Sequence, residues 1–451
     1  MNQKPRAASR RRFLKQTGAA LATFTIASPD ILGGNRTPPS EKLNCAFIGV
    51  GGRGRANLNG LSKNNNVVAL CDVDDKRAGK AFEHFKDAKR FKDFRKMFDA
   101  LEKSIDVVAV STPDHTHAIA AMAAIERKKH VYCEKPLAHS VHEVRELMKA
   151  ARENKVVTQL GNQGHSSRDI RKCVEWVRDG AIGNVHTVHA ACSAVHCRIA
   201  DLKKRTEPHA IPKELDWDLW LGPAVHRSFH PMYIRGAWRA WRPFGNGTIG
   251  DWVCHVVDPS FWALDLGLPS SVEALKQGDF DPGIHLDTFS RGSVLRFEFP
   301  AKEKRGAVTM YWYSGEERIP RPQGSDRDPP KTGAVLIGDK GIIQHGSHGA
   351  GGVRIVPDAK MKAYKQPAET IRRVPSHHAD FLMAIKEGRK AGSDFAEYGG
   401  PLTEIAMLGV ISQNFPGKKL EWDAEAARFT NCDEANAFVQ PPYRAGWTLR
   451  S

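Results

Sequence analysis

Residues 45–54 have the sequence CAFIGVGGRG, four apolar residues that run directly into a glycine-rich segment. The apolar run is typical of a buried parallel strand, and the polar residues that follow, up to Leu61, are consistent with a helix. Gly49 permits the tight turn after the strand, and Gly51 lets a phosphate approach the backbone. Gly54 permits close packing of the helix on the strand. This order of elements predicts a phosphate-binding turn at a helix N-terminus.

A second apolar run, residues 67–71, ends at Asp72, eighteen residues after Gly54. A carboxylate at the tip of the second strand accepts hydrogen bonds from the ribose hydroxyls of an adenosine, and it repels a 2′-phosphate. Together with the glycines, this acid predicts a Rossmann domain that binds NAD in preference to NADP. The residues that we expect at the cofactor here are Gly49, Gly51, Arg53, Gly54 and Asp72.

The alternation of strands and helices continues along the first half. Residues 105–111 and 130–133 are two further apolar runs of the buried-strand type. The first run leads into TPDHTH, which begins at Thr112, and the second leads into EKP, whose lysine is Lys135. Because ligands bind beyond the carboxyl ends of parallel strands, we expect Thr112 and Lys135 beside the cofactor.

The periodicity changes from about Gly164. One helical segment, residues 169–178, is followed by six strand-like runs, at residues 185–191, 271–275, 294–299, 307–313, 334–337 and 341–344. Several strands with few long helices predict an α+β second domain with a large, open, mostly antiparallel sheet. Two late helices, residues 376–388 and 402–415, are expected to return to the first domain. The exposed face of the sheet suits contact with a second copy, so we expect a homo-oligomer, either a dimer or a tetramer.

The first residues predict export. A basic head, SRRRFLK at residues 9–15, precedes a short apolar stretch, and its paired arginines indicate the twin-arginine route. The alternative is a disordered basic tail. Export would place the protein in the periplasm or another extracytoplasmic space. The predicted parts of the chain are a signal and linker (1–36), an NAD-binding Rossmann domain (42–162), an α+β substrate and oligomerisation domain (163–415) and a C-terminal extension (416–451).

Charge and cysteine usage exclude several classes of partner. The formal net charge is +16, and the six positive residues of the predicted signal leave about +10 for the rest. No basic run interleaves with aromatic residues, so nucleic acid is not the expected partner. No stretch of eighteen apolar residues is present, so no membrane-spanning helix is predicted. Cys192 and Cys197, with His189 and His196 nearby, match no familiar zinc spacing, and no metal site is predicted.

Several motifs are similar to those of one enzyme family. They are the glycine segment at 49–54, TPDHTH at 112–117, EKP at 134–136, GNQGH at 161–165, WDLWLGP at 217–223 and GTIGDWVCHVVD at 247–258. The chain resembles the Gfo/Idh/MocA oxidoreductases, the family of glucose–fructose oxidoreductase and inositol 2-dehydrogenase, and in particular a secreted bacterial branch. The resemblance runs from about Leu43 to Trp447.

The resemblance implies roles for individual residues. Lys135 would lie beside the nicotinamide and the reacting hydroxyl, and Glu134 near the nicotinamide ribose. Asp251 and His255 match the paired Asp and His of the family. Besides Arg53 and Thr112, the motifs imply cofactor contacts by His117 and Gln163. Two residues depart from the pattern, Val253 where glycine is frequent and Asp114 where asparagine is common.

Asp251 and His255 are four residues apart, so on a helix both project from one face. Removing a hydride from a secondary alcohol requires the hydroxyl proton to leave as well, and a histidine suits that task. Lys135 would stabilise the developing alkoxide, and Asp251 would either orient the imidazole or hydrogen-bond the sugar. The alternative is a buried Asp–His pair that only caps a helix.

Tryptophans and histidines crowd residues 217–262, among them Trp220, Trp238, Trp241, Trp252, His226 and His230. Aromatic faces stack on the C–H faces of sugar rings, so the cluster is consistent with a carbohydrate pocket, and core packing is the alternative for any single tryptophan.

The sequence therefore predicts an NAD-dependent oxidoreductase that acts on a sugar, polyol or glycoside hydroxyl with a tightly bound cofactor. Two alternatives stay open. One is a redox-neutral glycoside hydrolase or lyase that works through a transient keto-sugar, and the other is a non-catalytic sugar-binding protein.

Overall fold

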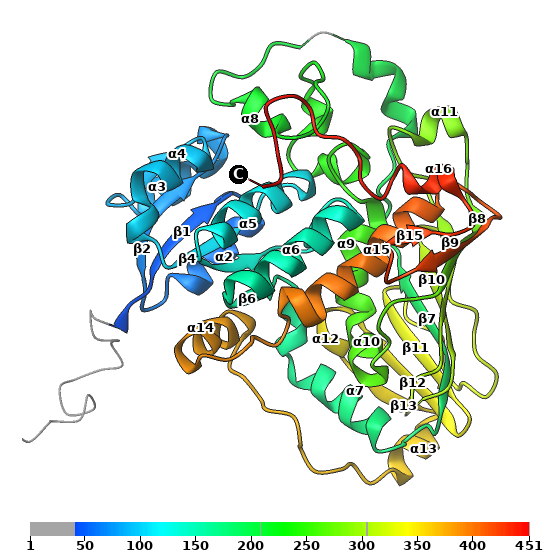
Figure 1. The fold of residues 1–451 in the computed structure, drawn as a ribbon. Helices are drawn as coiled ribbons and strands as arrows, with labels where there is room; N and C mark the ends of the chain where they lie inside the picture. The colour runs from blue at the N-terminus through cyan, green and yellow to red at the C-terminus, as the bar shows by residue number, and fades with distance from the viewer. Residues whose placement is uncertain (1–40, 208, 304, 451) are drawn as a thin grey trace, which may run out of the picture. The chain divides into compact units, whose positions relative to one another are not determined.

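The computed structural model describes residues 41–450 apart from 208 and 304, without the side chains of residues 205, 206, 284 and 285. The predicted export signal, residues 1–36, lies outside the described residues. All elements below belong to the compact unit that begins at Leu43, and they build two sheets (Figure 1).

The first sheet has six parallel strands in the order β3-β2-β1-β4-β5-β6. The strands are β1 (Asn44–Ile48), β2 (Asn66–Cys71), β3 (Lys89–Phe91), β4 (Val107–Val110), β5 (His130–Cys133) and β6 (Thr158–Leu160). The helices between them are α2 (Arg53–Leu61), α3 (Asp75–His84), α4 (Phe94–Leu101), α5 (His117–Glu126) and α6 (Val141–Asn154). The Rossmann prediction is confirmed, although β3 and β6 went unpredicted because three-residue strands leave too little pattern.

The strands of this sheet are apolar throughout because both faces are covered. Cys45 and Phe47 belong to an apolar cluster with α2, α3 and the late helix α14 (His377–Glu387). Ala46 and Ile48 belong to another cluster, with α4, α5 and α6. Successive residues of one strand therefore pack against helices on opposite faces of the sheet. Helix α14 returns to the first domain, as predicted.

The second sheet has nine strands in the order β13-β12-β11-β7-β10-β9-β8-β14-β15. They are β7 (Val185–Cys192), β8 (Ser271–Gln277), β9 (Ser293–Phe299), β10 (Val308–Ser314), β11 (Gly333–Gly338), β12 (Gly341–Gly346), β13 (Arg354–Val356), β14 (Lys419–Asp423) and β15 (Arg428–Phe429). Only β7 and β10 pair in parallel among these described strands, which confirms the mostly antiparallel prediction.

One face of the second sheet packs against helices. Phe297 and Trp312 point into a cluster with α7 (Arg168–Arg178), α9 (Gly247–Val256), α10 (Asp258–Leu264) and α15 (Gly400–Ser412). The opposite face carries a smaller cluster that includes Val335 and Tyr313. Short helices complete the unit: α8 (Trp217–Leu221), α11 (Pro282–His285), α12 (Ser347–Ala350), α13 (Asp358–Ala363) and α16 (Asp433–Asn436).

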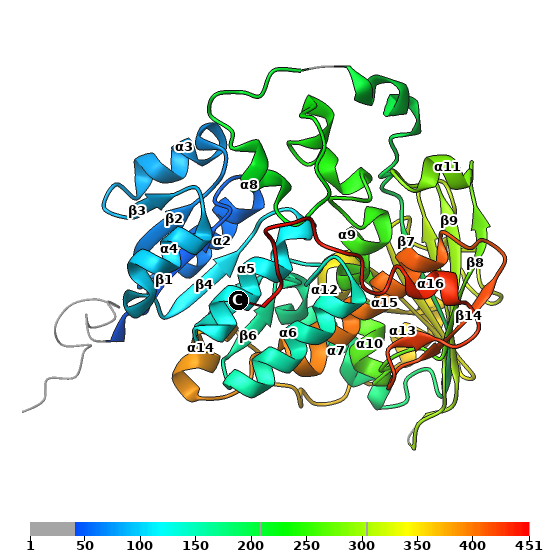
Figure 2. The ribbon, with the colours of Figure 1, turned by 45° about the horizontal axis from the view of Figure 1, so that its top comes forward.

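Two irregular segments lie against the Rossmann domain. Residues 193–246 join β7 to α9 through α8 and short 3₁₀ turns, drawn in green in Figure 2. The C-terminal residues return to the same region, where Tyr443 Oη donates to Glu143 Oε1 at 2.5 Å and Arg444 Nη1 pairs with Asp218 at 2.6 Å. In the described part of the chain, no helix has the length and apolar character needed to cross a membrane.

Candidate active site

The glycine turn after β1 requires glycine at two of its positions. Gly49 has a φ of 81°, and a Cβ there would lie 2.6 Å from the carbonyl oxygen of Ser111. A Cβ on Gly54 would lie 2.0 Å from the carbonyl oxygen of Gly49. A side chain at either position would open the turn, which supports the sequence-based explanation for both residues.

A cavity of about 340 Å³ lies at the carboxyl ends of the parallel strands. Its lining contains most of the residues predicted for the cofactor: Gly49, Gly51, Arg53, Asp72, Thr112, His117, Glu134 and Lys135. Gly54 is buried beneath the turn, and Gln163 does not line this cavity. The bare backbone of the turn leaves the room that a pyrophosphate needs, so these residues fit a dinucleotide.

Asp72 lines this cavity and is held by two backbone N–H groups. Its Oδ2 accepts from the backbone N–H of Val50 at 2.9 Å, and its Oδ1 accepts from that of Asp74 at 3.0 Å. Burial raises the pKa of Asp72, and these two N–H groups act against that rise. Arg77, on α3, and Lys92, just after β3, line the same cavity and were missed from the sequence, since a single lysine or arginine is ordinarily solvated.

Glu134 and His117 hold the cavity wall. Glu134 is buried, and its Oε1 accepts from Arg53 Nε at 3.0 Å and from Asn57 Nδ2 at 2.9 Å. The two ring nitrogens of His117 lie 2.7 Å from the Pro136 carbonyl and 2.9 Å from the Thr112 carbonyl. His117 thus joins the loops that follow β4 and β5, and both of its ring nitrogens contact backbone carbonyl oxygens.

Lys135 and Asp251 meet across the two domains. The Lys135 ammonium donates to the Asp251 carboxylate and, at 2.7 Å, to the Asp251 carbonyl oxygen. Asp251 also pairs with His196 Nε2 at 3.0 Å and with Arg239 Nε at 3.1 Å. Burial would raise the pKa of Asp251, but Lys135, His196 and Arg239 together hold it well below its usual value. Asp251 is therefore a carboxylate shared by three basic groups.

His255 lies one turn after Asp251 on α9, and the two do project from one helix as predicted. No hydrogen bond joins them in the described residues, because the Asp251 carboxylate is directed to Lys135, His196 and Arg239. His255 is buried, and its Nδ1 has no hydrogen-bond partner among the residues described. Burial, with the charge of Lys135, holds the pKa of His255 well below its usual value.

Three residues of this site were missed from the sequence: His196, Arg239 and His348. In the sequence, His196 lies beside Cys192 and Cys197, whose spacing matches no zinc site. Arg239 lies in the tryptophan-rich stretch, where it did not stand out. His348 stacks on His255 from the loop GSHGAGG, residues 346–352, whose density of glycines was the available signal. In that loop His348, Gly349 and Ala350 all have positive φ, at 55°, 92° and 61°.

Asp114, the departure noted in TPDHTH, is buried in the cavity wall. Its Oδ2 accepts from the backbone N–H and the Nδ2 of Asn246, both at 3.2 Å. Burial raises the pKa of Asp114 to about 7. A carboxyl group that keeps its proton near neutrality can occupy the place of an asparagine without adding a charge.

The tryptophan cluster is mainly core. Trp217, Trp220 and Trp241 pack together in one buried aromatic cluster. Trp220 and Trp238 also line the cavity, and the Arg239 guanidinium lies 4.2 Å from the centroid of the Trp238 ring. The aromatic faces available to a sugar are accordingly fewer than the sequence suggests.

Comparisons with known proteins identify the family. Residues 43–162 match the model described as oxidoreductase family, NAD-binding Rossmann fold, and residues 164–280 match that of its C-terminal alpha/beta domain. Inositol 2-dehydrogenase of Salmonella typhimurium is 27% identical over 188 residues, which cover 40% of this chain and 54% of that protein. The match thus spans about half the length of that relative.

Two further comparisons extend over more of the chain. Alpha-N-acetylgalactosaminidase of Shewanella oneidensis is 27% identical over 330 residues, 66% of this chain and 63% of that protein. The solved structure of the WlbA dehydrogenase from Bordetella pertussis, in complex with NADH and UDP-GlcNAcA, superposes with a TM-score of 0.55 at 15% identity, covering 85% of this chain and 99% of that one. Together the two family models match more than half of the chain, so the chain belongs to the Gfo/Idh/MocA oxidoreductase family.

Proposed function

We propose that this protein oxidises a secondary hydroxyl of a sugar, polyol or glycoside with NAD as hydride acceptor. The observation that carries the proposal is the placement of Lys135, paired with Asp251, in the wall of a cavity that the glycine turn also lines. Relatives named as inositol 2-dehydrogenase support this class of substrate.

Bound NAD would supply the electrophilic nicotinamide carbon that accepts the hydride. The glycine turn would hold its pyrophosphate, and Asp72 would hold the adenosine ribose. We propose NAD rather than NADP because a 2′-phosphate would meet the Asp72 carboxylate, which already faces the turn through Val50 N–H.

Side chains of this protein would stabilise the substrate oxygen and accept the hydroxyl proton. Lys135 Nζ, held in place by the Asp251 carboxylate and carbonyl, would donate to the substrate oxygen as negative charge develops there. The imidazole of His255, one turn after Asp251 on α9, would receive the proton, since burial and the Lys135 charge keep this ring unprotonated before reaction. Arg239 and His196 would fix the Asp251 carboxylate, and through it Lys135.

The decisive experiment uses full-length protein purified from its native compartment. Denaturation should release one NAD per chain, and incubation with a panel of sugars should convert it to NADH with formation of a keto-sugar. A cleaved glycoside with the cofactor back in its oxidised form would replace the proposal by redox-neutral hydrolysis. A protein that binds sugars and holds no nucleotide would leave only the sugar-binding alternative.

We also propose export by the twin-arginine route with the cofactor already inside. The coexistence of Arg10-Arg11 before Phe13 with a dinucleotide turn motivates this, because folded export carries a bound cofactor with it. Replacing both arginines by lysine should retain the protein in the cytoplasm. Secretion of the variant at wild-type level would contradict the route.

A homo-oligomer, dimer or tetramer, completes the proposal. The second sheet has one face buried by helices, while the other carries partly buried apolar side chains such as Tyr311 and Ile337. Light scattering coupled to size-exclusion chromatography tests this, and a monomer at micromolar concentration would refute it.

A further inference from the structure

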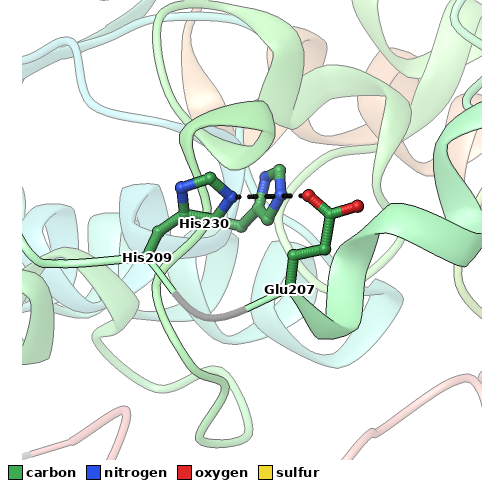
Figure 3. A group of neighbouring side chains, drawn as sticks. All are labelled: Glu207, His209 and His230. Atoms are coloured by element: carbon green, nitrogen blue, oxygen red, sulfur yellow. Dashed lines mark ion pairs between the residues drawn. The ribbon is translucent and has the colours of Figure 1, made fainter.

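Three side chains with metal-ligating atoms lie together on the segment between β7 and α9 (Figure 3). They are Glu207, His209 and His230, and their ligand atoms all lie within 4.8 Å of one another. Glu207 Oε2 is 4.0 Å from His209 Nε2, and the rings of His209 and His230 meet edge to face with centroids 4.2 Å apart. The spacing along the chain is E-x-H followed twenty-one residues later by H, which the sequence pattern did not single out.

His230 is the unusual member of the cluster. It is 7% exposed, and its buried Nε2 has no hydrogen-bond partner among the described residues. Its Nδ1 accepts from the backbone N–H of Met232 at 3.1 Å. Because Nδ1 accepts, the neutral ring carries its proton on Nε2, and a buried N–H without an acceptor is destabilising, so a change that removes this unpaired N–H would stabilise the folded protein.

We propose that Glu207, His209 and His230 bind a divalent transition-metal ion, with zinc as the ion that the donor set favours. Two imidazoles and one carboxylate are ligands that Zn²⁺ takes in three-ligand sites, with a water at the fourth position. Glu207 and His209 are exposed, so their side chains can draw together around an ion without disturbing the core. His230 then supplies the one ligand with a fixed position.

Ion binding at His230 Nε2 moves the ring proton to Nδ1. The hydrogen bond from the Met232 N–H is lost in that state, and three metal bonds replace it. The net gain therefore depends on Glu207 and His209 joining His230, which makes binding sensitive to each of the two exposed ligands.

The proposed metal site is close in sequence to residues that line the cofactor cavity. His230 directly precedes the 3₁₀ turn Pro231–Tyr233, and Ile234, Arg235 and Gly236 line the cofactor cavity. Arg239, a few residues on, bonds Asp251. An ion that ties Glu207 and His209 to His230 would restrain the chain just before these cavity-lining residues.

Zinc binding to the full-length protein tests the inference. After treatment with a chelator and dialysis, calorimetric titration with Zn²⁺ should give one ion per chain, and Zn²⁺ should raise the unfolding temperature. Glu207→Gln and His209→Gln should each weaken binding by about 100-fold or more, and His230→Gln should abolish it. The matched control is His186→Gln, an exposed histidine on β7, which should bind like wild type.

Because Glu207 and His209 are exposed, their variants should fold even if the His230 variant does not. Absence of Zn²⁺ binding by the wild-type protein would overturn the proposal. Binding of one ion with unchanged affinity in both exposed variants would overturn it as well, since the ion would then lie elsewhere.

Discussion

The imidazole rings of His255 and His348 lie stacked, with centroids 4.0 Å apart and planes inclined by 21°. His255 comes from α9, whereas His348 comes from the glycine-rich loop that follows β12. That loop is locked by Ser167, whose Oγ donates to the Gly349 carbonyl at 2.7 Å. Two of the three consecutive positive φ angles in that loop fall on residues other than glycine, His348 and Ala350, so the backbone beside this candidate proton acceptor is strained.

Gly349→Ala should displace His348 without changing any imidazole. A Cβ at Gly349 would lie 2.1 Å from the Gly164 carbonyl oxygen, in a residue with a φ of 92°. We expect a loss of about 1–3 kcal/mol in the free energy of unfolding and a fall of roughly tenfold or more in kcat. Chemical denaturation and steady-state kinetics measure the two effects. Gly352→Ala is the control, since no atom lies within 4 Å of its added Cβ, and equal kinetic effects in both variants would refute a role for His348.

Lys135→Met should lower kcat by about 10²–10⁴ because it removes the group that stabilises the developing alkoxide. Cofactor binding should be retained, because the glycine turn and Asp72 remain. Fluorescence titration with NADH separates the two effects. A Lys135→Met protein that turns over at half the wild-type rate would show that Lys135 only pairs with Asp251.

Asp72→Ala should weaken NAD binding by about 10–100-fold, the range expected when a charged hydrogen-bond acceptor is lost. The affinity for NADP should fall less or rise, because the carboxylate that repels a 2′-phosphate is gone. Calorimetry with both nucleotides measures the ratio. Glu83→Ala removes an exposed carboxylate of α3 that does not line the cavity, and its ratio should stay at the wild-type value.

Asp114→Asn should stabilise the protein relative to wild type, and this stabilising effect should grow as the pH rises. The folded-state pKa of about 7 exceeds the ordinary value of 3.8, so the wild-type protein loses stability as pH rises from about 4 to 7, and asparagine cannot ionise. The difference in the free energy of unfolding between variant and wild type should grow by roughly 3–4 kcal/mol across this range. Denaturation curves at several pH values test this, and a constant difference would contradict a raised pKa.

The protein should be acid-sensitive because of buried neutral histidines. Burial lowers the pKa of His115 and of His377 to about 3, whereas the unfolded chain takes up these protons near pH 6.5. The contribution of each of these two histidines to stability is therefore full above about pH 7 and falls below it by about 1.4 kcal/mol per pH unit. His115→Gln should reduce that slope by one proton, and an unchanged slope would show that His115 is not buried in its neutral form.

Much of the fold could be predicted from the sequence because the patterns are local. A four-residue apolar run before glycines specifies β1 and its turn, and alternating side chains specify β9 and β10 of the second sheet. What could not be predicted were β3 and β6, which are too short to carry a period, and the role of residues 416–451. Those residues contribute β14, which pairs with β8, a strand more than 140 residues earlier, and β15, which pairs with β14.

The same division holds for the candidate site. The sequence determined the cofactor turn, the acid Asp72 and the lysine of the EKP motif, since each follows a recognisable strand or belongs to a contiguous motif. Only the tertiary structure decided that Asp251 contacts His196 and Arg239 rather than His255, and that His348 covers His255. These partners are not set by helical or strand periodicity, because their positions depend on how the loop after β7, the segment before α9 and the loop after β12 pack against one another.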